Sequence, residues 1–580
     1  MKYCRLVLLL SFCLTASLAI GQSLDEGKNH FYSQRYELAD AVFKQVLEKN
    51  SSDPSVLFWA GQTKLELEKD SSKKVLLARS YFDDAAKLTN ANPLIMVGAG
   101  QADLLENKVN DARQKFESAL TMTKGRKGDD VEILTAIAKA ALAVKSEMLD
   151  FIIERVNQQP EKSQKSAELY VLLGDVVRKA KPGEAGGEAF RNYQQALEVN
   201  SNFALASYRL AKLFDSQKNW ELVYQYLSEC VQKDPKFTPA YYELFYYYFY
   251  RRDFATAEQQ LQKFIETKQP EKDIQDEFLY SQLCWARSDF NCAITKAESV
   301  IAALGNNTKP RVYRLLADAF YQQADTLKNQ GNEEAASTAF TNSKKYSDLF
   351  FSKSGGEDDQ VILYDYQLRA DILDKTGGSP EEIVNTYLQA VKVDSLANLK
   401  VDLLRKGADR FKARGDSLSR VLEGDLRTQA ISLKPNPSQR DYFDAGFAYY
   451  QGKAYEKADS IITVFVGLFP EEPYGYMMEY NIQRAVDSTM EKGSAVPWAM
   501  KYLEILEKDT VKNAKTIIGV SGYLAAYNAN ILKDKDKALE YLRRMLALDP
   551  DNAAIQNNIT ILEKSTANKP DAAEPPSSNN

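Results

Sequence analysis

The most restrictive features of this 580-residue chain are the residue types it lacks. It contains a single histidine, His30, and five cysteines. One histidine excludes metal sites built from two or three histidines, and it excludes the HExxH zinc helix. Glycine, with 27 residues, and proline, with 18, are scarce for this length, whereas tyrosine, with 33, is abundant. This composition favours long helices with large aromatic rings packed between them.

The chain also lacks an excess of positive charge. Its 74 Lys and Arg residues stand against 80 Asp and Glu residues, which gives a formal net charge of −6. A strongly basic nucleic-acid-binding protein is therefore excluded, and we expect no nucleic-acid partner. The hydrophobic fraction of 44% excludes wholesale disorder. The length excludes a single compact core.

The usual motifs of enzymes are missing as well. The sequence has no GxxxxGK[ST] phosphate loop and no glycine-bracketed serine nucleophile. Gly98 and Gly100 begin a dinucleotide-binding pattern, but Asp103 stands where its third glycine would be. His30 follows Gly27 by three residues, at a position that is typical of a packed side chain. We therefore predict no catalytic residue, no cofactor and no metal, and we expect a protein that is not an enzyme.

Residues 1–21 have the pattern of an export signal. Lys2 and Arg5 make the positive end, an apolar run follows over 6–19, and small residues within 19–21 fit a signal-peptidase site. Cleavage there would start the mature chain near residue 22. A bacterial protein exported to the periplasm, or to the periplasmic face of the outer membrane, is the expected result.

Membrane attachment is the alternative interpretation of this N-terminus. The apolar run is shorter than the ~20 residues of a spanning helix, which favours cleavage. Lipid attachment at Cys13 is disfavoured because the bulky Phe12 precedes it. No later segment is apolar and long enough to cross a bilayer, so the mature chain has no predicted transmembrane segment. Peripheral association with a membrane remains compatible with the sequence.

Three cysteines follow the signal, namely Cys230, Cys284 and Cys292. An oxidising compartment permits a disulfide. Cys284 falls late in one expected helix and Cys292 early in the next, so a bridge between them is one interpretation and two buried thiols are the other. Cys230 lies at an apolar helix position and is expected to be inert.

A fixed spacing of small and bulky residues recurs along the chain. In one copy, Gly446 is followed by Ala458 and then by the bulky Ile462. Small residues let two helices approach closely, the bulky residues fill the space beside them, and Asp-Pro pairs end the second helix. The defining small residues of the copies are Gly27 with Ala39, Gly100 with Ala112, Gly174 with Ala189, Ala211, Gly446 with Ala458, and Ala526 with Ala538.

This spacing resembles the tetratricopeptide repeat (TPR) family, whose unit is a pair of antiparallel helices of about 34 residues. The resemblance extends over most of residues 23–564. It implies an all-α fold, an α-solenoid of about a dozen antiparallel helix pairs, in which each unit buries its apolar face against its neighbours. The fold class that we predict is therefore a TPR-like superhelix.

The expected solenoid falls into two sub-arrays. The acidic, glycine-containing segment 352–359 is a poor helix former and separates an N-terminal array, 22–352, from a C-terminal array, 360–564. A break near 305–308 is the alternative. The C-terminal array ends in an expected capping helix with one polar side, and residues 565–580 form an expected disordered tail.

The resemblance also indicates where a ligand would bind. In TPR proteins the first helix of each pair lines the concave surface, which holds extended peptides. The densest aromatic segment, 238–254, lies on such a helix. The candidate partner-binding residues are Tyr208, Lys212, Tyr242, Tyr246, Phe249, Tyr250, Arg251, Arg252, Phe443, Phe447 and Tyr450.

Two interpretations of the aromatic segment stay open. Its rings either line the groove or replace a missing glycine in ordinary packing between helices. Tyrosine suits a binding surface because it buries a large area at low entropic cost. The lysine and asparagine clamp with which some TPR domains grip a C-terminal carboxylate is not expected, since no asparagine follows the small positions.

The sequence thus predicts a non-enzymatic protein-binding scaffold of the bacterial cell envelope, which recognises a protein or peptide on its concave face. The alternative is a glycan-binding component of an outer-membrane nutrient-uptake system, because starch-uptake proteins also combine helical repeats with aromatic platforms. Only four tryptophans are present, among them Trp220, and no lipid anchor is evident. Both features favour the protein-binding scaffold.

Overall fold

The computed structural model describes residues 23–90, 92–160, 166–268, 273–356 and 359–564. All elements within these residues are helices, so the predicted all-α solenoid of antiparallel helix pairs is confirmed. None of the described helices combines the length and the apolar character that a membrane span requires. The expected signal peptide, 1–21, and the expected tail, 565–580, lie outside the described residues.

Contacts between helices divide the chain into two compact units, 1–289 and 290–580. The helices of the first unit are α2 (Leu24–Tyr32), α3 (Tyr36–Lys49), α4 (Pro54–Leu67), α5 (Ser71–Thr89), α6 (Pro93–Leu105), α7 (Val109–Thr123), α8 (Val131–Ala141), α9 (Met148–Asn157), α10 (Ala167–Ala180), α11 (Gly186–Val199), α12 (Ala204–Ser216), α13 (Trp220–Lys233), α14 (Thr238–Tyr250), α15 (Phe254–Thr267) and α16 (Gln275–Ala286).

The second unit continues the same architecture. Its α-helices are α17 (Phe290–Leu304), α18 (Pro310–Asn329), α19 (Glu333–Lys353), α20 (Leu363–Lys375), α21 (Pro380–Ala390), α22 (Ala397–Arg414), α23 (Ser417–Ser432), α24 (Gln439–Gln451), α25 (Tyr455–Leu468), α26 (Pro473–Val486), α27 (Val496–Leu506), α28 (Thr510–Tyr527), α29 (Lys535–Leu548) and α30 (Ala553–Lys564). A π-helical turn, Asn528–Leu532, extends α28.

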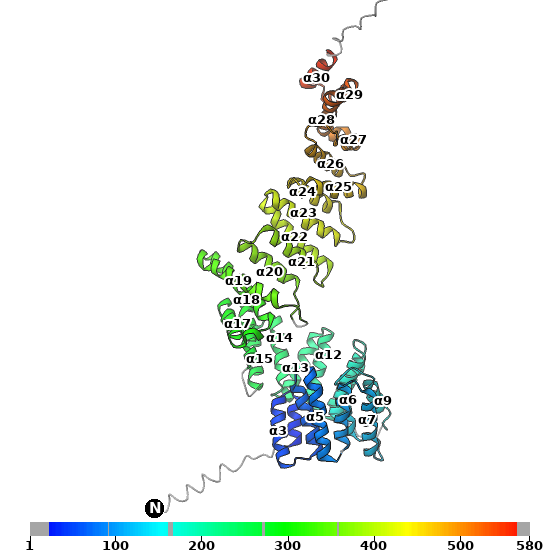
Figure 1. Cartoon of the computed structure of the whole chain (residues 1–580), viewed down its shortest axis with the longest axis vertical. Helices are drawn as coiled ribbons and strands as arrows, with labels where there is room; N and C mark the ends of the chain where they lie inside the picture. The colour runs from blue at the N-terminus through cyan, green and yellow to red at the C-terminus, as the bar shows by residue number, and fades with distance from the viewer. Residues whose placement is uncertain (1–22, 91, 161–165, 269–272, 357–358, 565–580) are drawn as a thin grey trace, which may run out of the picture. The chain divides into compact units, whose positions relative to one another are not determined.

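Consecutive helices pack as pairs within each unit, for example α6 with α7 and α12 with α13 in the first, and α22 with α23 and α28 with α29 in the second. These pairs are labelled in Figure 1. The helices begin where the sequence supplies caps: the Asp53 carboxylate accepts hydrogen bonds from two backbone N–H groups at the start of α4, and Pro54 stands at its first position.

The division between the units differs from the predicted break at 352–359, which lies inside the second unit between α19 and α20. Helices on both sides of that segment are in contact. The ring centroids of Phe351 and Tyr366 are 5.2 Å apart, and the Arg369 guanidinium pairs with Asp348 at 2.9 Å. Helices α19 and α20 are therefore packed against each other within the second unit.

The small residues of the sequence repeat lie where the two helices of a pair meet. A Cβ atom added to Gly27 would lie 2.2 Å from the Phe43 ring, and one added to Gly100 would lie 2.5 Å from the Phe116 ring. No side chain fits such a space. The glycine of the first helix is thus covered by the bulky residue that follows it sixteen positions later in the second helix.

The other repeat positions are placed in the same way, with one exception. Each glycine of the remaining pairs, and each small residue of the second helix, is covered by a neighbouring helix. Ala526, by contrast, is half-buried, and its neighbour Ala525 is buried instead. The covered positions are Gly174 and Gly446 in the first helices, and Ala39, Ala112, Ala189, Ala458 and Ala538 in the second.

The turn between the helices of a pair is also repeated. A residue in the left-handed region lies seven positions after the small residue, as Gln34 does after Gly27 (φ 58°) and Lys453 does after Gly446 (φ 61°). Arg252 occupies this turn position after α14, with φ 63°. The backbone conformation of Arg252 is therefore set by the repeat.

A buried carboxyl group, that of Glu479, lies between α25 and α26. The Glu479 side chain is fully buried, and its Oε1 accepts a hydrogen bond from Thr463 Oγ1 at 3.2 Å. Burial, followed by the nearby Asp459 carboxylate, raises the pKa of Glu479 to about 8. Glu479 therefore carries a proton at neutral pH in the folded chain.

The first prediction concerns the glycine contact. Gly174→Ala would place a Cβ 2.2 Å from the Tyr193 ring. That ring cannot move freely because its hydroxyl donates to Asp175 Oδ1 at 2.8 Å. We expect a loss of about 1–3 kcal/mol in the free energy of unfolding, measured by thermal denaturation. The matched control is Gly519→Ala in α28, where no atom lies within 4 Å, so a gain of about 0.5–1 kcal/mol is expected. Equal effects of both changes would contradict the close contact.

The second prediction concerns Glu479. Its folded pKa lies above its unfolded value, so the folded state binds the extra proton and stability falls as the pH rises from about 4.5 to about 8. Glu479→Gln removes the titration, and we expect the melting temperature of this variant to fall less over that pH range than that of the unchanged chain. The exposed Glu504 serves as the control, and Glu504→Gln should leave the slope unchanged. A slope that is the same in all three proteins would refute the assignment.

Candidate binding groove

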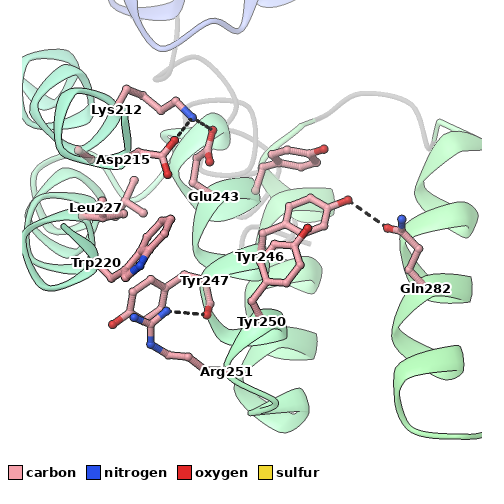
Figure 2. A pocket seen from close by; sticks show the side chains of 13 residues that line it. Lys212, Asp215, Trp220, Leu227, Glu243, Tyr246, Tyr247, Tyr250, Arg251 and Gln282 are labelled. Atoms are coloured by element: carbon pink, nitrogen blue, oxygen red, sulfur yellow. Dashed lines mark hydrogen bonds and ion pairs between the residues drawn. The ribbon is translucent and has the colours of Figure 1, made fainter. Parts of the chain in front are cut away.

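A groove of about 830 Å³ lies in the first unit between α12, α13, α14 and α16. Figure 2 shows its side chains, which lie on two sides of α14: Tyr246 and Tyr250 point toward Gln282, and Tyr247 and Arg251 lie near Trp220. Helix α14 contributes Tyr242, Glu243, Tyr246, Tyr247, Tyr250 and Arg251. The segment that the sequence singled out for its density of aromatic residues therefore contributes more of the lining than any other segment.

Three tyrosines of α14 form a ladder along the groove. Tyr242, Tyr246 and Tyr250 are four residues apart, and this spacing places them on one helix face. The ring centroids of Tyr242 and Tyr246 are 5.0 Å apart, and those of Tyr246 and Tyr250 are 5.8 Å apart. Tyr246 donates its hydroxyl hydrogen to Gln282 Oε1 at 3.0 Å. Tyr250 remains 77% exposed and is available to a ligand.

Other rings of the same segment belong to the core. Phe245 occupies the position of the small residue in the repeat and is fully buried beside Ala257. Tyr241 is also buried. Phe249, a candidate groove residue, packs against Phe245 and Phe254 and does not line the groove. Both interpretations of the segment thus apply, each to a different face of α14.

One end of the groove is charged. Lys212 Nζ lies 3.0 Å from Glu243 Oε1 and 3.2 Å from Asp215 Oδ2 (Figure 2). Burial favours the neutral form of Lys212, but the two carboxylates outweigh it and raise the pKa of this lysine. Tyr208 is buried, and its hydroxyl lies 3.5 Å from Glu243 Oε1. Two carboxylates thus face one ammonium group, so this end carries a net negative charge.

The other end of the groove is aromatic and cationic. The Arg251 guanidinium lies 3.6 Å from the centre of the Tyr247 ring, and it donates a hydrogen bond to the Tyr247 carbonyl oxygen at 3.2 Å. The Tyr224 ring stacks on Tyr247 at 5.1 Å. Trp220, which is 46% exposed, completes the wall. Arg252 lies in the following turn and does not line the groove.

A second cavity, of about 790 Å³, adjoins the groove. It shares Tyr242 and Glu243 with the groove, and Tyr208 lines it as well. The connection between α2 and α3 contributes to its wall. Two hydrogen bonds join this connection to the segment before α14: Ser33 donates to Asp234 Oδ2 at 2.7 Å, and Arg35 donates to the Lys236 carbonyl oxygen. Residues of the first repeat therefore lie beside α14 and extend the lined surface.

Comparison with known proteins adds the following findings. No protein-family model matches the chain, and no curated protein matches it. Solved structures that resemble it include the C-terminal part of a TPR repeat-containing protein from Cytophaga hutchinsonii, with 24% identity over 49% of this chain and 99% of that one and a TM-score of 0.26. A TPR protein from Parabacteroides merdae has 13% identity over 54% and 97%, with a TM-score of 0.32.

A third similar structure is the human IFIT1 dimer with m7Gppp-AAAA, at 11% identity over 76% of this chain and 96% of that one, with a TM-score of 0.36. Because all these TM-scores are below 0.5, the fold assignment depends on the helix pairs, the covered glycines and the repeated turn. The chain has a TPR-like fold.

A further set of candidate residues lies on the first helix of another TPR-like pair, α24, in the second unit. The rings of Phe443 and Phe447 stack with centroids 5.8 Å apart, and Phe443 also meets the Tyr474 ring edge-on. Tyr450 contacts Tyr455 of α25. Phe447 and Tyr474 are exposed. These rings form a small aromatic surface that is separate from the groove of the first unit.

The groove residues that the sequence analysis missed include Asp215, Trp220, Glu243, Tyr247 and Gln282. The TPR-like frame selects positions next to the small residue of each first helix, whereas Trp220 begins a second helix, α13. Tyr247 stands within a run of aromatic residues and has no distinguishing spacing. Glu243 could have been found as an acidic residue within that run, since a charge at such a position needs a partner or solvent.

The single histidine has no place in the groove. His30 is half-buried on α2, and burial, followed by the nearby Arg35 cation, lowers its pKa. Within the described part of the chain, no group of three His, Cys, Asp or Glu side chains is arranged to hold a metal ion.

The three cysteines of the TPR-like region differ in state. Cys284 on α16 and Cys292 on α17 are both disulfide-bonded, and Cys230 is a free, buried thiol whose pKa is raised by burial. We propose that Cys284 and Cys292 are bonded to each other, which is one of the two interpretations that their spacing left open.

Peptide mapping tests this pairing. Trypsin cleaves after Arg287, between the two cysteines, so a bridge must join two separate tryptic peptides until it is reduced. In the denatured, unreduced chain we expect an alkylating reagent to label Cys230 and to leave Cys284 and Cys292 unlabelled. Labelling of all three without reduction would show that the bridge does not form.

Proposed function

We propose that this TPR-like protein is a non-enzymatic binding scaffold whose groove on α12–α16 holds an extended segment of another protein. The observation that carries the proposal is the tyrosine ladder, which leaves Tyr242 and Tyr250 exposed beside a groove of about 830 Å³. Exposed rings of this size are costly to leave in water and gain free energy when an apolar side chain covers them.

Helical repeats suit this task because they present side chains from successive helices along one surface. The second cavity continues past Tyr242 and Glu243 and lengthens the path that a chain could follow. Polar groups line both cavities, among them Gln282 and Arg35. Such groups can pair with the backbone N–H and C=O groups of an extended ligand.

We further propose that the protein acts in the envelope of a Gram-negative-type cell, with its partner in the periplasm or on the periplasmic face of the outer membrane. The support for this proposal is the signal-like segment at 1–21, with its positive end and apolar run. Disulfide-bonded Cys284 and Cys292 also suit an oxidising compartment.

A glycan is the second candidate ligand, and the observation that favours it is Trp220. Its indole is 46% exposed at the edge of the groove. Sugar rings stack on exposed aromatic faces. Titration with oligosaccharides in the experiment below separates this ligand class from peptides.

The test is selection of 12-residue peptides from a displayed library on the purified full chain. We expect the selected peptides to lose at least tenfold in affinity for the Tyr246→Ala/Arg251→Ala variant, with helicity unchanged by circular dichroism. The matched control removes the same two residue types elsewhere, as Tyr474→Ala/Arg252→Gln. Binding that is equal in both variants would place the site outside the groove. Failure to select any peptide, together with binding of an oligosaccharide, would replace the proposal by the glycan alternative.

A further inference from the structure

We infer that the ligand of the groove carries one carboxylate beside an apolar side chain, and that Arg251 binds this carboxylate. The inference rests on the proposed function, since it specifies which protein segments the groove selects. The partner is therefore an extended segment in which Asp, Glu or a C-terminal carboxylate flanks an apolar residue.

The guanidinium of Arg251 is already oriented for such a ligand by its contacts within the chain. Its guanidinium is stacked at 3.6 Å on the Tyr247 ring and donates one hydrogen bond, to the Tyr247 carbonyl oxygen. Tyr247 in turn stacks on Tyr224, which limits the movement of the ring. A guanidinium has five N–H donors in a planar arrangement that matches a carboxylate. The stacking thus fixes the plane of the cation and leaves donors free.

Arg251 also differs from Arg79 and Arg209 of the same unit. Arg79 pairs with Asp103 and Glu106, and Arg209 pairs with Asp175 at 2.9 Å. Within the described residues no such carboxylate partner is found for Arg251, whose contacts are those with Tyr247. An exposed cation at the edge of an aromatic groove, which makes no ion pair among the described residues, is complementary to an acidic group on a ligand.

The middle of the groove accepts an apolar side chain. Trp220 and Leu227 of α13 lie on the same side of α14 as Tyr247 (Figure 2), and Val223 of α13 lines the groove as well. A groove lined by the rings of Trp220 and Tyr247 accommodates an aromatic ring, a proline or a leucine of the ligand. The apolar residue of the ligand must therefore lie next to its carboxylate, because Tyr247 lines the apolar space and supports Arg251 at the same time.

The opposite end of the groove rejects a second acidic group. Glu243 and Asp215 already outnumber Lys212 there, so that end is negatively charged. Glu243 and Arg251 are eight residues apart on one helix, which corresponds to about 12 Å along its axis. An extended chain covers this distance in about four residues. The groove therefore favours one acid at one end of a segment of about four residues and disfavours acids at both ends.

The experiment uses the peptide that binds most tightly in the displayed-library selection, together with two variants of that peptide. In one variant each Asp or Glu is replaced by Asn or Gln, and in another an extra Asp is placed on the far side of the apolar residue. Fluorescence anisotropy gives the dissociation constant of each peptide for the full chain. The proteins are the unchanged chain, Arg251→Gln and, as a matched control, Arg252→Gln, which removes the same charge one residue away and outside the groove.

We expect the acidic peptide to bind about three- to tenfold more tightly than its amide variant. This ratio should fall to about one with Arg251→Gln and persist with Arg252→Gln. It should also shrink when salt is raised from 0.05 to 0.5 M, because salt screens an exposed ion pair. The peptide with a second acid should bind more weakly than the peptide with one.

The two possible failures are distinguishable. A ratio near one for the unchanged chain, or an equal ratio in the Arg251→Gln and Arg252→Gln variants, overturns the role of Arg251. In that case the peptide-binding function still stands, provided that Tyr246→Ala weakens both peptides. If no peptide binds the unchanged chain, the proposed function and this inference both fail.

Discussion

The structure depends on one recurring contact, in which a small residue of a first helix lies beneath a large side chain of the helix that follows. At Gly27, Gly174 and Gly446 the available space is less than a methyl group would need. Because the helices touch at that point, their apolar stripes are buried along their whole length, and successive pairs can stack. The buried aromatic rings that cover these glycines, such as Phe43 and Tyr193, form much of the core.

The candidate groove exists because α14 departs from this rule. Phe245 fills the position of the small residue and is fully buried against Ala257 and Leu279. The helix has more rings than the core can take, so those spaced four residues apart on another face remain at the surface. Tyr242 and Tyr250 are left exposed, and the groove forms beside them. The same aromatic segment thus supplies buried rings to the core and exposed rings to the groove.

The two ends of the groove differ in the charged groups that they carry. At one end Lys212 is held by Glu243 of the next pair, and at the other Arg251 is held by Tyr247 through stacking and one hydrogen bond to its carbonyl oxygen. The first end is satisfied within the chain, whereas the second still has unused donors. This asymmetry is not evident from the overall charge of −6, because a sum over the whole chain does not say where the charges lie.

The sequence by itself determined the all-α repeat. The spacing of Gly446, Ala458 and Ile462 indicates which residues are in contact, because contacts within a helix pair join positions that are separated by a constant number of residues. It also identified the aromatic segment of α14. Tertiary structure alone decided which of its rings are exposed, and it brought Asp234 to Ser33, 201 residues away. It also separated two adjacent arginines: Arg251 ends against a ring in the groove, while Arg252 adopts a left-handed turn that leads out of it. Such differences depend on backbone direction and on neighbours from distant helices, which no local spacing contains.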